Sequence, residues 1–359
     1  MNILMVNQGQ FGYMAGYYHY CKHLVAQGHH IVYLCNDYHL KPVELDGVDV
    51  IYTPIESAIK WRMQFRRQLK NIVTNNKFDV ALCSYFKGCT MIRDCFKNIP
   101  TIIDIRSGDI APNPIKRFLF NKLIQFETAL YNRRMILSQS LADKLKLKRD
   151  SYDIVPLGAD VICDTDKSYT DAINMLYVGT LKQRDIHKTI EGFVRFAKEH
   201  PQAQISYDII GFGTSQEESL INNLISDNNI GDKVKFHGRI NYQLLGPFFE
   251  KANLGIAFVP MTPYYDCQPT TKIYEYVLSG LYCIATRTYE NRILVDERNT
   301  ILCDDNADSF YQALKQFYLC DKSQWKTSEI KSSMSQYQWT NIVGNLLINN
   351  FKKLLLNNH

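Results

Sequence analysis

The sequence lacks several patterns that would assign a protein class at once. None of the ten cysteines forms a CxxC pair, and no apolar run approaches the roughly 20 residues that span a bilayer. The first seven residues have neither the basic region nor the long apolar stretch of a secretory signal peptide. These absences argue against a zinc site, a disulfide framework, a membrane span and secretion. We therefore expect buried, reduced thiols and a cytoplasmic protein.

Excess charge is scarce as well. The 41 Lys and Arg residues against 36 Asp and Glu residues leave a formal charge of +5, and 46% of the chain is hydrophobic. These values exclude a disordered or acidic-tail protein, and the small, dispersed excess does not favour nucleic acid as a partner. An anionic ligand or an anionic surface is compatible with it. A length of 359 residues, at about 100–200 residues per domain, predicts two domains.

What the sequence does contain is an alternation of short apolar runs and helical patterns. Strands are expected at 3–6, 31–35, 48–52, 80–84, 101–105, 135–138, 175–178, 205–210, 234–237, 255–259, 283–286 and 301–303. Helices fill the intervals, and a last helix at 341–356 has no strand after it. This alternation predicts an α/β protein with two doubly wound parallel sheets. The polar stretch 156–174 is the expected linker between them.

Glycines stand at the ends of several expected strands. Gly12 follows the first strand, Gly179 and Thr180 end the strand that opens the second half, and Gly211 and Gly213 end the next. Glycine permits close backbone approach, and the helix that follows offers N–H groups to an anion. An ordinary strand-to-helix turn has the same need for glycine, so each turn is weak evidence alone.

Two cations follow the Gly179 turn. Lys182 and Arg184 lie in the loop that leads into the next helix, where a pyrophosphate would need fixed positive charge. The alternative is that both are solvated loop charges.

The helix expected at 270–279 is the strongest segment. Thr270 and Thr271 begin it, and their free N–H groups suit a diphosphate. Lys272 lies in the first turn, where a cation is unfavourable to the helix dipole unless an anion is bound. Glu275, three residues on and on a similar face, suits the diol of a ribose. The alternative is a surface Lys–Glu pair.

In their order along the chain, these motifs resemble the retaining glycosyltransferases of the GT-B fold, glycosyltransferase family 4. The matching stretches are the glycine loop after the first strand, 155–160, 177–181 with Arg184, 211–213, 269–276 and 337–339. The resemblance covers essentially the whole chain. It implies an acceptor-binding Rossmann-like domain at 1–163, a nucleotide-sugar-binding one at 164–335 across a cleft, and a helix at 336–359 that returns to the first domain.

The resemblance also implies roles for individual residues. Arg184 and Lys272 would be the catalytic cations that hold the donor diphosphate, and Arg106 and Asp109 would lie on the acceptor side. The donor-binding residues would be Gly12, Gly179, Thr180, Gly211, Gly213, Thr270, Thr271, Ile273 and Glu275.

The chain departs from the family pattern at three places. Thr180 replaces the arginine of a Gly-Arg pair, and the loop after it is one residue short. Cys267 stands where the first glutamate of a Glu-x7-Glu element is expected. Arg106 replaces the acceptor-side histidine and cannot act as a base, which agrees with a mechanism in which the leaving diphosphate takes the acceptor proton.

The resemblance therefore implies a retaining, metal-independent glycosyltransferase of the hexosyltransferase type. It would use a nucleotide-diphosphate sugar, without a cofactor, to extend a glycan or a lipid-linked acceptor in surface polysaccharide biosynthesis. A sugar-nucleotide 2-epimerase and a non-catalytic nucleotide-sugar-binding subunit are the alternatives.

Two stretches of the first domain combine basic and apolar residues. These are 60–70 and 114–127, and such helices can lie on anionic lipid at the inner face of a membrane. The alternative is that their apolar stripes belong to the core and their charges are solvated.

Overall fold

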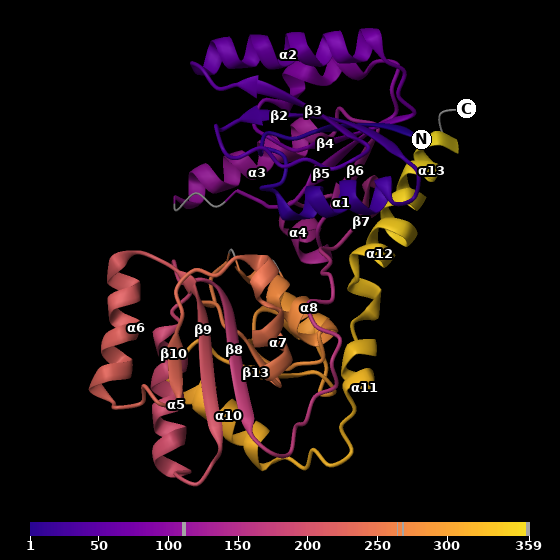
Figure 1. Ribbon diagram of the computed structural model, residues 1–359. Helices are drawn as coiled ribbons and strands as arrows, with labels where there is room; N and C mark the ends of the chain where they lie inside the picture. The colour runs from indigo at the N-terminus through magenta and orange to yellow at the C-terminus, as the bar shows by residue number, and fades with distance from the viewer. Residues whose placement is uncertain (110–112, 264, 268, 357–359) are drawn as a thin grey trace. The chain divides into compact units, whose positions relative to one another are not determined.

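The computed structural model describes residues 1–109, 113–263, 265–267 and 269–356. The chain divides into two compact units, which are coloured along the chain in Figure 1. The N-terminal unit comprises Met1–Gly158 and Trp339–His359, and the C-terminal unit comprises Ala159–Gln338. The sequence placed these divisions at 163 and 335. Most of the expected linker 156–174 therefore belongs to the C-terminal unit, where the Tyr169 hydroxyl donates to the Gly280 carbonyl at 2.6 Å.

The N-terminal unit is a parallel sheet with helices on both faces. Its strands are β1 (Asn2–Val6), β2 (His30–Asp37), β3 (Val48–Pro54), β4 (Val80–Ser84), β5 (Thr101–Ile105), β6 (Arg133–Ile136) and β7 (Tyr152–Ile154). Its helices before residue 158 are α1 (Ala15–Val25), α2 (Ala58–Asn75), α3 (Pro114–Thr128), α4 (Gln139–Lys144) and the 3₁₀ helices η1 (Cys89–Phe96) and η2 (Arg149–Ser151). The seven strands follow the order β3-β2-β1-β4-β5-β6-β7.

The alternation of side chains along β1 explains the two layers of helices. Leu4 and Val6 point to the cluster that α2 and η1 cover. Met5 points to the other face, where the Cys21 thiol of α1 lies 3.5 Å from its sulfur. A strand buried on both faces is continuously apolar, as β1 is.

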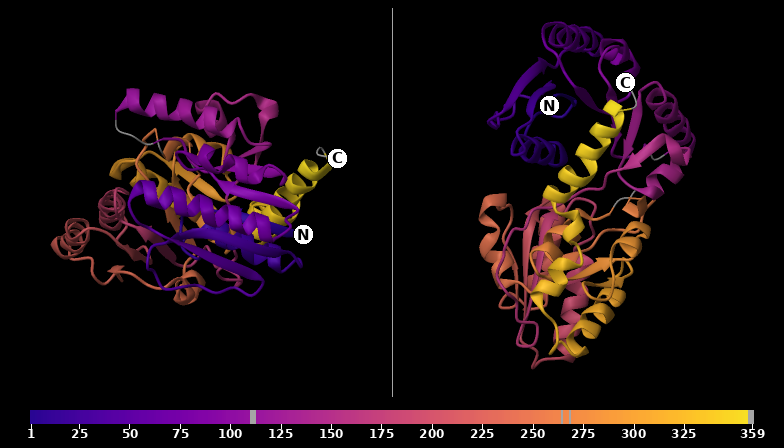
Figure 2. Two further views of the ribbon diagram at one scale, coloured as in Figure 1. Left: turned by 90° about the horizontal axis from the view of Figure 1, so that it is seen from above. Right: turned by 90° about the vertical axis from the view of Figure 1, so that its right-hand side faces the viewer.

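The C-terminal segment packs within the N-terminal unit, as the resemblance implied. It consists of α12 (Trp339–Asn341), the π-helical segment η6 (Ile342–Leu347) and α13 (Ile348–Leu356), which follow one another without a break (Figure 2). The Trp339 ring stacks on the His19 ring of α1, with centroids 5.1 Å apart.

The C-terminal unit repeats the architecture with six strands in the order β10-β9-β8-β11-β12-β13. The strands are β8 (Ile173–Thr180), β9 (Ile205–Phe212), β10 (Val234–Phe236), β11 (Leu254–Ala257), β12 (Tyr282–Thr286) and β13 (Thr300–Cys303). The helices are α5 (His187–Glu199), α6 (Ser215–Asp227), α7 (Gly246–Lys251), α8 (Thr271–Leu278), α9 (Tyr289–Leu294), α10 (Ala307–Leu319), α11 (Thr327–Ser332) and the short η3 (Tyr242–Leu244), η4 (Tyr265–Cys267) and η5 (Ser335–Tyr337).

Close helix packing covers both faces of this second sheet. A Cβ on Gly192 of α5 would lie 2.7 Å from the Ala307 carbonyl oxygen, so α5 and α10 approach closely because that residue is glycine. On the other face, a Cβ on Gly255 of β11 would overlap the Tyr276 ring of α8 at 2.4 Å. The Tyr276 hydroxyl also accepts a hydrogen bond from the Val178 N–H at 2.8 Å.

Several short elements were not expected, and one expected helix was wrong. The unexpected elements are β7, η1, α9 and α11, which are too short to carry a periodic pattern. The helix expected at 242–251 is split into η3 and α7, because Pro247 begins a new helix. All ten cysteines are free and eight are buried, as expected.

Among the described residues, the helices include none with the length and apolar character needed to cross a membrane.

Candidate functional site

The glycines at the ends of β8 and β9 hold the two strands together. Gly179 and Gly211 are paired in register, and a Cβ on Gly211 would lie 2.0 Å from the Gly179 carbonyl oxygen. A Cβ on Gly213 would lie 2.9 Å from the Leu181 Cβ. Strand packing alone therefore requires glycine at 211 and 213, whether or not a nucleotide lies against them.

The loop after β8 has a constrained backbone. Gln183 and Asp185 have φ values of 56° and 52°, in the left-handed region that costs a non-glycine residue about 1–3 kcal/mol. The Gln183 N–H donates to the Glu217 carboxylate at 2.9 Å, and Lys188 pairs with Asp185 at 2.9 Å. These anchors on α6 and α5 offset the strain and fix the residue between the two strained positions, Arg184.

Arg184 is partly buried in this loop. Its guanidinium lies over the Tyr265 ring, with the Cζ atom 4.5 Å from the ring centroid. Within the described part of the chain, no carboxylate forms an ion pair with it. A positioned arginine that stacks on an aromatic ring keeps its hydrogen-bond donors for an anion.

Thr180 contributes to the same loop. Its hydroxyl donates to the Phe212 carbonyl at 3.3 Å and accepts the Lys182 N–H at 3.2 Å. The residue that replaces the family's arginine thus has a structural contact on each side.

The start of α8 offers fewer free N–H groups than expected. The Thr270 N–H donates to the Asn291 side-chain oxygen at 3.2 Å, and the Ile273 N–H donates to the Thr270 carbonyl at 3.0 Å. Of the four N–H groups from 270 to 273, those of Thr271 and Lys272 have no partner among the described residues. An anion at this helix would meet these two donors and the helix dipole.

Lys272 and Glu275 pair with each other. The Lys272 Nζ lies 2.5 Å from the Glu275 carboxylate, and the two side chains are only 23% and 16% exposed. The resemblance gives Lys272 to the diphosphate and Glu275 to the ribose, so both predicted roles now start from one shielded ion pair. A donor that engages both would separate or share this pair.

Cys267, which replaces the expected glutamate, ends η4 and is partly exposed. The neighbouring Asp266 carboxylate accepts the Tyr289 N–H at 2.7 Å. That hydrogen bond ties η4 to the start of α9.

In the N-terminal unit, Gly12 lies in a compact turn. Its φ is +87°, and a Cβ there would lie 2.4 Å from the Val43 side chain. The buried Gln10 side chain donates to the Leu40 carbonyl at 2.8 Å and accepts the Tyr38 N–H at 2.9 Å. The turn therefore needs glycine for its own conformation.

Arg106, on the expected acceptor side, belongs to a buried network. Its Nε lies 2.6 Å from the Asp104 carboxylate, and its other nitrogens donate to the Tyr20 hydroxyl and, at 3.1 Å, to the Val155 carbonyl. Burial raises the pKa of Asp104 above its usual value, while Arg106 and the Tyr17 hydroxyl lower it. The second carboxylate oxygen of Asp104 is buried and has no hydrogen-bond partner within the described ranges.

Asp109, the other expected acceptor-side residue, pairs with Lys87 at 2.9 Å. Its N–H donates to the Asn121 side chain of α3 at 2.9 Å. Arg106 and Asp109 thus belong to separate networks.

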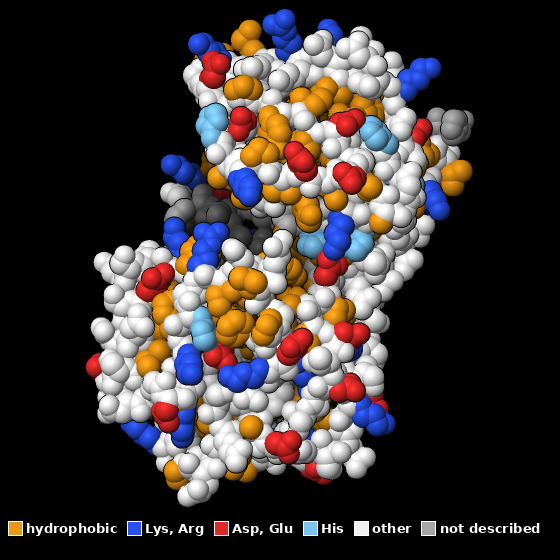
Figure 3. All heavy atoms as spheres, in the orientation of Figure 1, with side chains coloured by type: hydrophobic (Ala, Val, Ile, Leu, Met, Phe, Trp, Pro, Cys, Tyr) orange, Lys and Arg blue, Asp and Glu red, His pale blue; other side chains and the backbone are white. Residues whose placement is uncertain are grey.

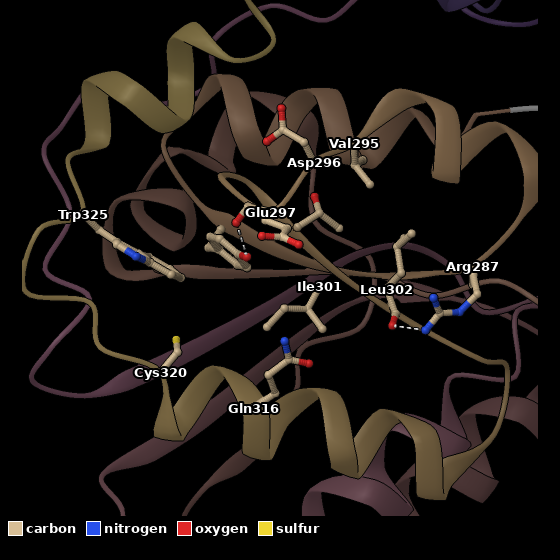
Figure 4. A pocket seen from close by; sticks show the side chains of 11 residues that line it. Arg287, Val295, Asp296, Glu297, Ile301, Leu302, Gln316, Cys320 and Trp325 are labelled. Atoms are coloured by element: carbon tan, nitrogen blue, oxygen red, sulfur yellow. Dashed lines mark hydrogen bonds between the residues drawn. The ribbon is translucent and has the colours of Figure 1, made fainter.

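A cavity of about 550 Å³ lies beside the edge strand β13 (Figure 4). Trp325, Gln316 of α10 and Glu297 line it, with the Arg287 guanidinium donating to the Leu302 carbonyl at 2.9 Å. None of the residues selected from the sequence lines this cavity.

Three positioning residues escaped the sequence analysis. Tyr265 supports Arg184, Asn291 orients the start of α8, and Glu217 fixes the loop before Arg184. Glu217 carried a signal, since it is the third residue after Thr214 and completes a capping box with it. Tyr265 and Asn291 act across tertiary contacts that no spacing predicts.

Comparisons with known proteins bear on both units. Residues 172–319 match the family model described as Glycosyl transferases group 1. No curated protein matches the sequence significantly.

Three solved structures illustrate the likeness over the whole chain. Sucrose-phosphate synthase of Thermosynechococcus elongatus has a TM-score of 0.73 at 16% identity, over 100% of both chains. The lipopolysaccharide outer core galactosyltransferase WaaB has 0.71 at 14%, over 98% of this chain and 100% of that one. Anabaena Alr3699/HepE, in complex with UDP and glucose, has 0.67 at 12%, over 98% and 100%. The expected GT-B fold is confirmed.

Proposed function

We propose that this chain, which has the GT-B fold and carries a Glycosyl transferases group 1 region at residues 172–319, is a glycosyltransferase. It takes a sugar from a nucleotide-diphosphate sugar and transfers it, with retention of configuration, to a glycan or a lipid-linked acceptor. A role in surface polysaccharide biosynthesis follows from the same resemblance.

The observation that supports donor binding most is the state of Arg184. It is held by a strained, anchored loop and by the Tyr265 ring, with no carboxylate partner among the described residues. A fixed cation without a counter-charge costs stability unless an anion uses it. The donor diphosphate is the anion that the family match supplies, and UDP in the structure of Anabaena Alr3699/HepE agrees with such a donor.

In the proposed reaction, the bond between the sugar C1 and the diphosphate oxygen breaks as the acceptor hydroxyl approaches C1. Arg184, Lys272 and the N–H groups of Thr271 and Lys272 would stabilise the charge that develops on the departing diphosphate. The new C1–O bond forms on the face that the diphosphate leaves, and the acceptor proton goes to a diphosphate oxygen. Neither a metal nor a protein base is needed for that balance.

The acceptor-side residues agree with a reaction that has no protein base at 106. A guanidinium paired with Asp104 cannot accept a proton. In this proposal Arg106 maintains the local structure, and Glu275 and the glycines at 211 and 213 shape the nucleotide side of the donor pocket.

A panel of nucleotide sugars, with and without candidate glycan acceptors, tests the proposal. We expect release of a nucleoside diphosphate with at least one donor, at a rate that chelation with EDTA leaves unchanged. An isomerised sugar nucleotide would instead indicate an epimerase. Donor binding without turnover, measured by calorimetry, would indicate a binding subunit.

Arg195→Ala is the matched control for Arg184→Ala in these assays. Arg195 also lies over an aromatic ring, that of Tyr311 at 4.1 Å, but it belongs to α5. Turnover should survive its loss and collapse when Arg184 is removed.

A further inference from the structure

Helix α3 directs polar residues inward and apolar residues outward. Its buried residues are Ile124, Glu127 and Thr128. Its large exposed residues are Ile115, Phe118, Leu119, Leu123 and Phe126. A surface helix of a globular protein normally has the opposite arrangement, with its apolar stripe against the core.

Hydrogen bonds fix α3 in this orientation. The Glu127 carboxylate, which is 3% exposed, accepts the Tyr85 hydroxyl at 2.9 Å and the Gly88 N–H at 2.8 Å. The Arg134 guanidinium donates to the Thr128 hydroxyl at 3.0 Å. Rotating the helix to bury its apolar face would leave these polar groups without partners, at a cost that opposes the rotation.

The outward residues form one continuous face. Positions 115, 118, 119, 122, 123 and 126 recur at helical spacing. Ile115, Phe118, Leu119 and Phe126 are 70%, 55%, 58% and 65% exposed. Exposed apolar groups that adjoin one another along a helix mark an interaction surface more often than scattered ones do.

The charge on α3 indicates the chemistry of the partner. Lys116, Arg117 and Lys122 accompany the apolar face, and the helix has one acidic residue, the buried Glu127. Lys122 lies 5.8 Å from the Phe118 ring centroid, as a cation does when its stem follows an apolar surface. Uniform positive charge beside aromatic and aliphatic side chains complements an anionic lipid surface.

We propose that the chain docks on anionic lipid bilayers through the outward face of α3, with Ile115, Phe118, Leu119 and Phe126 entering the headgroup region. The inference is independent of the proposed sugar transfer, because it rests on the surface of α3 alone.

Helix α2 does not share this property, although the sequence suggested both stretches. Phe65, Leu69 and Ile72 of α2 are buried in the core of the N-terminal unit. Basic side chains stand along the outer side of α2 (Figure 3), where Ile59 and Met63 are its exposed large apolar residues. The apolar stripe of α2 is therefore occupied, and that of α3 is not.

Co-sedimentation of the full chain with vesicles tests the proposal. We expect binding to phosphatidylcholine vesicles that contain phosphatidylglycerol, and little binding to pure phosphatidylcholine. The triple variant Phe118→Gln/Leu119→Gln/Phe126→Gln should bind at least about tenfold more weakly, since it removes most of the apolar area. Lys116→Gln/Lys122→Gln should lose about fivefold per cation and most of its salt dependence.

Ile59→Gln/Met63→Gln on α2 is the matched control and should bind as the wild type does. Circular dichroism and thermal unfolding verify that each variant folds, which is expected because the changed side chains face solvent. Absence of vesicle binding by the wild type would overturn the proposal, as would binding that the triple variant retains. A dimer that the triple variant dissolves, without vesicle binding, would assign the face to a second copy instead.

Discussion

Arg106 and Arg184 show two uses of the same side chain in one protein. Arg106 follows β5 and is surrounded by Asp104, Tyr20 and the Val155 carbonyl. Arg184 follows β8 and has the Tyr265 ring as its support, with no carboxylate partner among the described residues. Both follow strands of parallel sheets, so topology does not distinguish them. Their surroundings do.

The difference separates a residue that maintains the fold from one that is available to a ligand. A paired and buried arginine stabilises the fold because removing it would expose its partner to an apolar environment. A supported but unpaired arginine adds little to the fold and retains its charge for an incoming anion. The two positions should therefore respond to mutation in opposite assays.

Loss of Arg106 should have the largest effect, on stability. Arg106→Ala leaves the Asp104 carboxylate buried without its cation, and we expect the free energy of unfolding to fall by about 3–5 kcal/mol. Urea unfolding measures it. Adding Asp104→Asn to Arg106→Met should recover part of the loss by removing the buried charge. Equal stability of Arg106→Ala and the wild type would contradict a structural role.

Loss of Arg184 should have the next largest effect, on turnover. Arg184→Ala should lower kcat/KM by about 10²- to 10³-fold, because a fixed donor to the departing diphosphate is gone. Its free energy of unfolding should change by no more than about 0.5 kcal/mol. The nucleotide-sugar assay and urea unfolding give both values, and unchanged turnover would remove Arg184 from the donor site.

Part of this comparison was accessible from the sequence. The strands at 80–84 and 101–105 and the helix at 215–227 were predicted with the bounds that the structure has, because their patterns are long or flanked by clear turns. The Asp104–Arg106 pair also had a signal, since residues two apart on a strand face the same side. The same holds for Lys272 and Glu275, which are three apart on a helix.

The rest depends on contacts between distant segments. Neither the stacking of Arg184 on Tyr265 nor the hydrogen bond from Thr270 to Asn291 follows from any spacing. The sequence showed the amphipathic pattern of α3, but not that its apolar face points outward. That orientation is set by Glu127, whose partners Tyr85 and Gly88 lie about forty residues earlier in the chain.

The Lys272–Glu275 pair stands between the two arginines, and its mutation should sharpen the comparison. Glu275→Gln should weaken binding of a nucleoside diphosphate about tenfold, or about 1.4 kcal/mol, because the ribose loses its acceptor. Binding of inorganic pyrophosphate should not weaken, since Lys272 is released from its partner. Calorimetry with both ligands decides the matter. Equal weakening of both would mean that Glu275 acts by positioning Lys272.

Asp208 gives the smallest expected effect and a test by pH. Burial raises the pKa of its carboxyl, but hydrogen bonds from Lys251 and His237, each at 2.7 Å, lower it further, and the net shift is downward. A carboxyl with a lowered folded-state pKa stabilises the fold above its unfolded-state pKa, and this contribution is lost as the pH falls through the folded value.

Asp208→Asn should therefore cost about 1 kcal/mol at neutral pH, and the difference from the wild type should shrink below about pH 4. Urea unfolding across that range measures it, with Asp227→Asn as an exposed control in the same unit. A difference that stays constant with pH would mean that the cost comes from packing. A difference that shrinks would show that Asp208, like Asp104, is a carboxylate whose cation belongs to the fold. Arg184 would then remain the contrasting case, a cation available to a ligand.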